Sequence, residues 1–343
     1  MKLYEITLKP ASGFGTSLKG DTLFGHFCWQ AAYDPTLLNG GLGKWIDCYE
    51  KKPFLVFSSA WPKFFNGKTR YAFKRPDLPL SYLFRDPSGD DKKSQMSERK
   101  KNQSKKWMLL DKNLSLSLNA VTYVTAKGLA EIAWKELTEE TRRIMEKAFS
   151  SSFLEEFTQP HNTINRLTMT TGEGMFAPFS QTSFFYYPET KLAVFVLIDD
   201  DATEIERVNT ALERIGQRGY GRDASTGLGK FGLGEHKELP IPKSSSPNAC
   251  YVLSPVVPGK RMFKEHFFVP FVRFGKHGDI LAKSSNPFKN PVIMADEGAV
   301  FVTEDNSIFQ KPYIGRGVVG ISKAMPQSVV QGYSIYLPFK LEI

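Results

Sequence analysis

The sequence predicts an α+β fold in two parts, with helices and strands mixed in the first part and strands dominating the second. Alternating apolar and polar residues open the chain at Lys2–Lys9, and an apolar run follows much later at Lys191–Ile198. A helical period of three to four residues marks Thr22–Ala32 and the segment that follows Thr203. A stretch rich in proline and serine, residues 240–247, separates these segments from four further strand-like runs.

The first part predicts a strand, a helix, three strands, a second helix and a last strand. Asp21 is the expected N-cap of the first helix, and Thr203 with Glu206 is the expected capping box of the second. Two runs, Thr182–Tyr187 and Lys191–Ile198, predict a hairpin around Pro188-Glu189-Thr190. The other expected elements are a strand at Phe54–Ser58, helix ends at Gly216 and Gly219, and a returning strand at Lys230–Lys237.

A basic insertion interrupts this order over roughly residues 62–128. Ser88–Lys106 contains seven basic and three acidic residues and almost nothing apolar, so we expect a mobile loop there. Lys127–Phe149 predicts a helix that breaks or restarts at Thr138.

The second part predicts strands without a long helix. The runs are Ala249–Val257, Phe267–Phe274, Gly298–Thr303 and Tyr333–Leu341. We therefore expect one domain over residues 1–240, a linker over 241–247 and a second domain over 248–343. Both parts begin with a strand-rich segment of similar character, which fits a duplicated domain.

Composition narrows the classes of function. The 343 residues carry a net charge of +9 with 41% hydrophobic and 24% charged residues, which is typical of a globular chain that favours a polyanionic partner. Three cysteines argue against a disulfide scaffold and a cysteine zinc site, and indicate a reducing, cytoplasmic compartment. The longest strongly apolar run, Leu192–Ile198, is far shorter than the ~20 residues of a membrane span, so we expect no membrane association. No metal or cofactor is expected.

A glycine-rich segment, GYGRDASTGLGKF, carries the strongest signal for ligand binding. Glycine allows backbone to approach a ligand closely, and successive N–H groups in such a loop can bind an anion. The segment is not a Walker A loop, because it lacks GK followed by Ser or Thr. It is not a dinucleotide-binding motif either, because it follows a helix and precedes a strand. A tight connection without any ligand is the alternative. The candidate residues are Gly219, Tyr220, Gly221, Arg222, Ser225, Thr226, Gly227, Gly229 and Lys230.

Two further segments suit phosphate or ribose contacts. PHNTINRLTMTTGEGMF, residues 160–176, holds the candidates His161, Asn165, Arg166 and Thr168. GFGTSLKGDTLF, residues 13–24, places Lys19 at the start of the first helix, where free N–H groups favour anions. A polar surface loop and simple helix capping are the respective alternatives.

Two other groups have a catalytic or metal-binding alternative. His26 lies beside the apolar arc of the first helix, where a histidine could cleave RNA by acid–base chemistry, although packing at the core edge is the more common role. Asp199-Asp200-Asp201 stands at a strand end before a helix, so a solvated turn is expected rather than a metal site.

Together these segments resemble the RAMP superfamily of CRISPR effector proteins. GYGRDASTGLGKF matches the loop after the second helix of the family's ferredoxin-like unit, and HNTINRLT is similar to its H-x-x-I-(D/N)-R-x-T motif. KGDTLFG, residues 19–25, resembles the first strand–helix junction. YVLSPVVP and NPFKNPVIMADEGAV in the second part look like the Csm-type subunits that cap the 5′ end of the guide RNA. Asn165 stands where aspartate is common, and the basic insertion has no counterpart.

The resemblance implies two ferredoxin-like (RRM-like) domains, the first with the glycine-rich loop and the insertion and the second degenerate. It implies a non-catalytic subunit of a type III-A interference complex that binds the 5′ tag of the crRNA. Its implied protein partners are a large polymerase-like signalling subunit and a backbone RAMP subunit. A metal-independent, guide-processing RAMP endoribonuclease that uses His26 is the alternative, and an RNA-free structural subunit is a third class.

Overall fold

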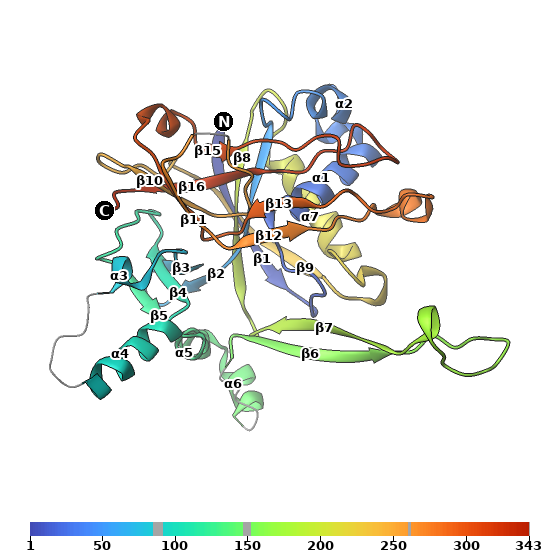
Figure 1. The fold of residues 1–343 in the computed structure, drawn as a ribbon, viewed down its shortest axis with the longest axis horizontal. Helices are drawn as coiled ribbons and strands as arrows, with labels where there is room; N and C mark the ends of the chain where they lie inside the picture. Colours follow the sequence, from blue (N-terminus) through green and yellow to red (C-terminus); the bar gives the residue numbers. More distant parts are fainter. Residues whose placement is uncertain (85–91, 147–151, 260–261, 343) are drawn as a thin grey trace.

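The computed structural model describes residues 1–84, 92–146, 152–259 and 262–342. Over these residues it is a mixed α/β structure built on antiparallel sheets (Figure 1). A seven-stranded sheet has the order β5-β4-β3-β2-β8-β1-β9, and a five-stranded sheet has the order β11-β14-β10-β16-β15. Two smaller sheets pair β6 with β7 and β12 with β13.

Four strands of the large sheet and two helices follow one another in the order β-α-β-β-α-β. The residue pattern instead predicts three strands between the two helices, because it counts Thr182–Tyr187 as a strand of this unit. All the pairings within this unit are antiparallel, and β8 and β1 lie at its centre. The elements are β1 (Lys2–Pro10), α1 (Gly20–Tyr33), β2 (Leu55–Phe65), β8 (Lys191–Ile198), α7 (Ile205–Arg218) and β9 (Phe231–Leu239).

Both helices bury the apolar faces that their periodicity predicts, but both expected N-caps are wrong. Lys19 occupies the N-cap of α1, while the Asp21 carboxylate lies in the first turn and pairs with Arg273. Glu204 occupies the N-cap of α7 without a side-chain bond, and the Thr203 hydroxyl donates to the Leu37 carbonyl instead. In both cases a distant partner competes successfully for the side chain that local spacing assigns to the cap.

The hairpin predicted between Thr182–Tyr187 and Lys191–Ile198 is also wrong. β7 (Phe179–Tyr186) pairs along its whole length with β6 (Leu154–His161), whereas β8 pairs with β1 and β2. β8 is apolar on both faces, and the centre of the large sheet buries both of them. β6 and β7 are mostly exposed and form a separate arm, which extends away from the rest of the molecule (Figure 1).

The basic insertion is largely ordered structure. Its strands β3 (Thr69–Lys74), β4 (Trp107–Asp111) and β5 (Thr122–Val124) extend the large sheet beyond β2. The loop expected at Ser88–Lys106 is wrong over residues 92–104, which form the helix α4 (Lys92–Ser104); residues 88–91 lie outside the described part. The helix buries only Asn102, so an apolar pattern could not have predicted it. The short helix α3 (Leu80–Leu83) precedes it.

The break predicted at Thr138 is confirmed. α5 (Ala126–Glu136) and α6 (Glu139–Met145) are separate helices, and the Thr138 hydroxyl accepts a hydrogen bond from the backbone N–H of Thr141. The end of the predicted helix, residues 147–149, lies outside the described part.

The last third is strand-rich, as predicted. Among its described residues from 249 onward, the only helical segments are short 3-10 turns. Its strands are β10 (Ala249–Val252), β11 (Glu265–Phe267), β12 (Pro270–Arg273), β13 (Val292–Ala295), β14 (Val300–Val302), β15 (Tyr313–Gly315) and β16 (Tyr333–Phe339). One apolar core includes residues of both parts. Tyr251 packs edge-to-face against Phe73 at 6.3 Å and donates its hydroxyl hydrogen to the Lys74 carbonyl. The segment 240–247 has no helix or strand.

Two glycines inside helices give a matched test of this packing. A methyl group at Gly25 in α1 meets nothing within 4 Å, so Gly25→Ala should raise the free energy of unfolding by about 0.5–1 kcal/mol. A methyl group at Gly216 in α7 would lie 2.1 Å from the Phe231 carbonyl oxygen, so Gly216→Ala should lower it by about 1–3 kcal/mol. Urea denaturation measures both, and a change of the same sign in both variants would contradict this packing.

Candidate nucleic-acid interface

The glycine-rich loop packs directly against the segment that joins β1 to α1. Gly229 donates its N–H to the Gly13 carbonyl at 2.7 Å, and Lys230 donates its N–H to the Ser12 hydroxyl at 2.9 Å. Arg222 donates its backbone N–H to the Thr16 hydroxyl at 3.0 Å. The structure thus brings together two of the three segments that the sequence singles out.

Gly221 and Gly229 of this loop are required by positive φ and by close approach of neighbouring atoms. Gly229 has a φ of 74°, and a Cβ there would lie 2.1 Å from the Tyr220 carbonyl oxygen. Gly221 has a φ of 74°, and a Cβ there would lie 2.6 Å from the Thr16 Cβ. Any larger side chain would separate the loop from its support.

Tyr220 is fully buried beneath the loop. Its hydroxyl donates to the Ser17 carbonyl at 2.8 Å and accepts the Lys19 backbone N–H at 3.2 Å. The phenol therefore holds the β1–α1 segment in place, and its contacts leave none of its ring on the surface for a base.

Arg222 links the loop to the base of the β6–β7 arm. Its guanidinium donates to the Thr182 carbonyl at 2.5 Å and to the Ser183 hydroxyl at 3.2 Å, and its Nε lies 3.2 Å from an Asp223 carboxylate oxygen. A backbone pair between Phe14 and Phe184 adds a second attachment for the arm. These bonds give Arg222 a structural role. Its side chain nevertheless remains about one-third exposed to solvent.

Lys19 is occupied by carboxylates from the second part of the chain. Its ammonium pairs with Asp296 and, at 2.6 Å, with Glu297, and it lies 4.5 Å from the centre of the Phe271 ring. Burial and the neighbouring Asp296 raise the pKa of Glu297, while Lys19 opposes this shift. A phosphate contact by Lys19 therefore requires the ammonium to leave this cluster.

His26 supports the glycine-rich loop through its ring. Its Nε2 accepts the Gly221 backbone N–H at 3.2 Å, and the ring lies 4.9 Å from that of Tyr220. Burial lowers the pKa of His26 to about 4, so the ring is neutral near pH 7. The Nε2 atom of His26 is thus already used as an acceptor within the chain.

The remaining predicted residues lie far along the arm. His161 ends β6 and stacks on Phe179 at 5.2 Å. Asn165, Arg166 and Thr168 belong to the loop between β6 and β7, where the Asn165 carboxamide accepts the Leu167 N–H at 2.9 Å. Figure 1 shows this loop at the outer end of the arm, away from the glycine-rich loop that follows α7.

The arm tip also exposes apolar side chains that are not among the predicted site residues. Ile164, Leu167 and Met169 are 57%, 96% and 76% exposed. Leu167 and Met169 alternate with Arg166 and Thr168 in the sequence. This alternation could have predicted a tip with one apolar and one polar face. On the glycine-rich loop itself, Ser225 and Lys230 are exposed, and neither side chain has a partner within the described residues.

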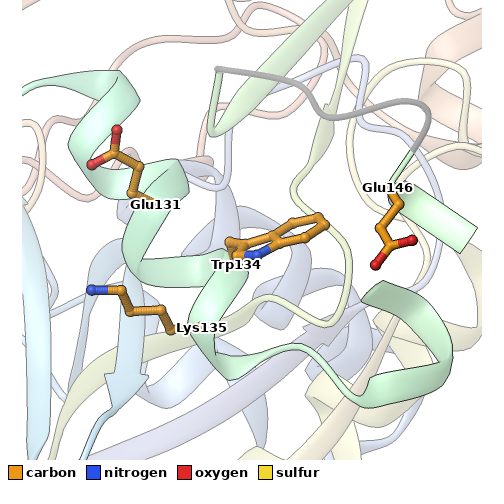
Figure 2. A pocket seen from close by; sticks show the side chains of 4 residues that line it. All are labelled: Glu131, Trp134, Lys135 and Glu146. Carbon is orange, nitrogen blue, oxygen red and sulfur yellow. The ribbon is translucent and has the colours of Figure 1, made fainter. Parts of the chain in front are cut away.

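A cavity of about 420 Å³ beside α5 and α6 belongs to none of these segments. Glu131, Trp134, Lys135 and Glu146 line it, and none of them is a predicted site residue (Figure 2). Across the described ranges, no three His, Cys, Asp or Glu side chains gather in a way that could hold a metal ion. None of the described helices is both long enough and apolar enough to cross a membrane.

Comparison with known proteins finds solved structures of similar fold, whereas no family model and no curated sequence matches the chain. A chain of the Csm1–Csm4 cassette in complex with pppApA is similar with a TM-score of 0.53 and 15% identity, covering 100% of this chain and 99% of that one. A chain of the Csm3–Csm4 subcomplex of the type III-A CRISPR-Cas interference complex gives 0.55 and 15%, covering 99% and 100%. Csm4 is the component common to both assemblies. This chain has the Csm4 fold. The predicted resemblance to Csm-type RAMP subunits is thereby confirmed at the level of the fold.

The buried neutral state of His26 predicts a dependence of stability on pH. Its folded pKa of about 4 lies below the unfolded value of ~6.5, so the unfolded chain binds a proton first as the pH falls. The stabilisation is complete above pH 6.5 and is lost towards pH 4, on the order of 3 kcal/mol in total. His26→Gln, whose amide oxygen can still accept the Gly221 N–H, should reduce the loss of stability across this window. Urea midpoints measured from pH 7 to pH 4 report this loss. An equal fall of the midpoint in the wild type and in His26→Gln would contradict the role assigned to His26.

Proposed function

We propose that this chain is a non-catalytic, RNA-binding subunit of a cytoplasmic type III-A CRISPR interference complex. It binds the 5′ tag of the crRNA, and it contacts a large polymerase-like subunit and a backbone RAMP subunit. The observation that carries the proposal is the similarity in fold to Csm4-containing assemblies over essentially the whole of both chains. Those assemblies pair Csm4 with Csm1 and with Csm3, which supports the two protein contacts.

The two-domain ferredoxin-like interpretation is part of this proposal. The strand order β2-β8-β1-β9 with crossovers through α1 and α7 supports it for the first part. The second part supports it less directly, through an antiparallel sheet whose described strands are joined by loops and 3-10 turns.

The surface chemistry supports RNA as the partner. The net charge of +9 favours a polyanion, and the arm presents Arg166 beside Asn165 and Thr168, which can contact phosphate and ribose. The exposed side chains of Leu167 and Met169 add apolar surface on which an unstacked base can pack. The glycine-rich loop contributes its exposed Ser225 and Lys230 and holds the arm in place through Arg222.

The bonding of His26 supports a non-catalytic role. A general acid or base needs a nitrogen within reach of the proton that it transfers, and His26 Nε2 accepts a backbone N–H from Gly221. Within the described residues, no second titratable side chain is bonded to that ring. The alternative function, a guide-processing endoribonuclease, is tested by the cleavage assay with His26→Ala.

The deciding experiment expresses the chain with its neighbouring subunits and sequences the 5′ ends of the RNA that co-purifies. We expect one repeat-derived 5′ end, together with tag-dependent binding when synthetic guides with and without the tag compete. Repeat RNA should remain intact with the wild type and with His26→Ala in the absence of metal. Because acid–base catalysis contributes about 10²–10⁴-fold, cleavage by the wild type that is lost in a folded His26→Ala protein would establish the endoribonuclease instead.

The arm tip gives the sharpest prediction on affinity. Arg166→Ala should weaken guide binding by about 1–3 kcal/mol and reduce the slope of log K against log salt by about 1, because one charged phosphate contact is lost. Arg143→Ala on α6 removes an arginine that is 80% exposed and serves as the matched control. Filter binding at several salt concentrations measures both. Equal losses in the two variants would assign the effect to overall charge rather than to the tip.

A further inference from the structure

A cavity of about 550 Å³ lies on the side of α1 that faces α2 (Gly41–Ile46) and two loops of the second part. This volume falls in the range of about 300–1,000 Å³ typical of small-molecule sites. Most of its wall is apolar, as such sites require, and includes Cys28, Ala31, Leu42, Ile46, Met325 and Val329. None of the RNA-binding candidates lines it.

Three hydrogen-bond donors line this cavity without a partner. The Lys289 ammonium, the Trp29 indole N–H and the Ser328 hydroxyl make no hydrogen bond or ion pair with any described residue. The Lys289 stem packs against Gly275, where a Cβ would lie 3.1 Å from the lysine Cδ. These three donor groups are open to the cavity, so a ligand that carries acceptor atoms could bind them.

No described residue forms an ion pair with Lys289, although the exposed Asp47 also lines the cavity. Burial lowers the pKa of this lysine, which is the expected result for a cation without a counter-ion. Asp21 is engaged by Arg273 in two hydrogen bonds of 2.5 and 2.9 Å. Burial raises the pKa of the Cys28 thiol to about 12, so the thiol is neutral and supplies no counter-charge to Lys289. The His277 ring is hydrogen-bonded to the Ser322 hydroxyl at 2.7 Å.

We propose that this cavity binds a small amphipathic anion, with an apolar or aromatic body between α1 and α2 and a carboxylate or phosphate head on Lys289. The apolar wall accounts for the body, the unpaired ammonium for the charge, and the Trp29 and Ser328 donors for further oxygen acceptors on the head. The site is independent of the RNA surface, because α1 directs His26 to the glycine-rich loop and Gly25, Cys28 and Trp29 to the cavity.

Gly25 allows the cavity to be filled without disturbing the fold. It lines the cavity in mid-helix, and a Cβ there meets nothing within 4 Å. Gly25→Leu therefore places a branched side chain in the ligand space while improving helix propensity. Gly25→Ala fills much less of the space and is the matched control for the backbone effect.

The test uses the full chain and the fluorescent anion 1-anilinonaphthalene-8-sulfonate, displaced by octanoate, octyl phosphate or the neutral octanamide. We expect one saturable site on the wild type, a loss of affinity of at least tenfold in Gly25→Leu and in Lys289→Met, and near-wild-type affinity in Gly25→Ala. Lys276→Met removes an exposed lysine outside the cavity lining and should change nothing. Octanoate or octyl phosphate, whichever competes better, identifies the head group, and octanamide should compete at least tenfold less well than either.

Thermal unfolding of each variant separates lost binding from lost folding, and Gly25→Leu should unfold at or above the wild-type midpoint. If Gly25→Leu unfolds early, the comparison of Lys289→Met with Lys276→Met decides alone. Absence of saturable binding to the wild type up to 1 mM probe would overturn the proposal. Equal binding by the wild type, Gly25→Leu and Lys289→Met would also overturn it. So would a result in which octanamide competes as well as octanoate. Guide-RNA binding should not change in these variants, so failure here leaves the RNA proposal untouched.

Discussion

A buried irregularity in β2 determines how the two parts of the chain fit together. The pairing of β2 with β8 shifts register between Phe57 and Ala60, which leaves backbone groups in the middle of a sheet without strand partners. The Gln331 side chain, fully buried, accepts the Phe57 N–H at 2.9 Å and donates to the Phe57 carbonyl at 2.7 Å. Ser59 donates its N–H to the Leu253 carbonyl. Since a buried backbone group without a partner costs about 1–3 kcal/mol, these bonds hold the second part in one position on the first.

That junction also sets where α1 begins. A Cβ on Gly20 would lie 2.2 Å from the Phe57 carbonyl oxygen, so the helix starts directly over the irregular strand. Asp21 and Lys19 then reach the second part as ion pairs with Arg273 and with the Asp296–Glu297 carboxylates. Removing one partner of a buried pair costs about 3–5 kcal/mol, because the other charge stays buried. The helix that carries His26, and through it the glycine-rich loop, is thus positioned by residues more than two hundred positions away in sequence.

The sequence predicted best what depends on local periodicity. The apolar faces of α1 and α7, the strand β1, the break at Thr138 and the helix-to-strand placement of the glycine-rich loop all follow from side-chain spacing over one or two turns. The capping roles of Asp21 and Thr203 could not be predicted, because Arg273 and the Leu37 carbonyl take those side chains in the folded chain. The partner of β7 was equally hidden, since β6 has no apolar alternation to mark it. The helix α4 buries one polar residue, so composition indicated a loop.

The candidate site shows the same division between local pattern and distant contact. Glycine spacing correctly located a loop of unusual backbone, yet that backbone is explained by its approach to Tyr220 and Thr16 without any ligand. Likewise, Lys19, Tyr220 and Arg222 have the chemistry of RNA-binding residues, but their partners are carboxylates, carbonyls and hydroxyls of this chain. Side chains that bond to other groups of this chain stabilise the loop, whereas exposed side chains without such partners are available to bind a ligand. By that criterion the glycine-rich motif is a structural framework, while Lys230 and the arm tip at Arg166 are the exposed groups that the proposed RNA binding would use.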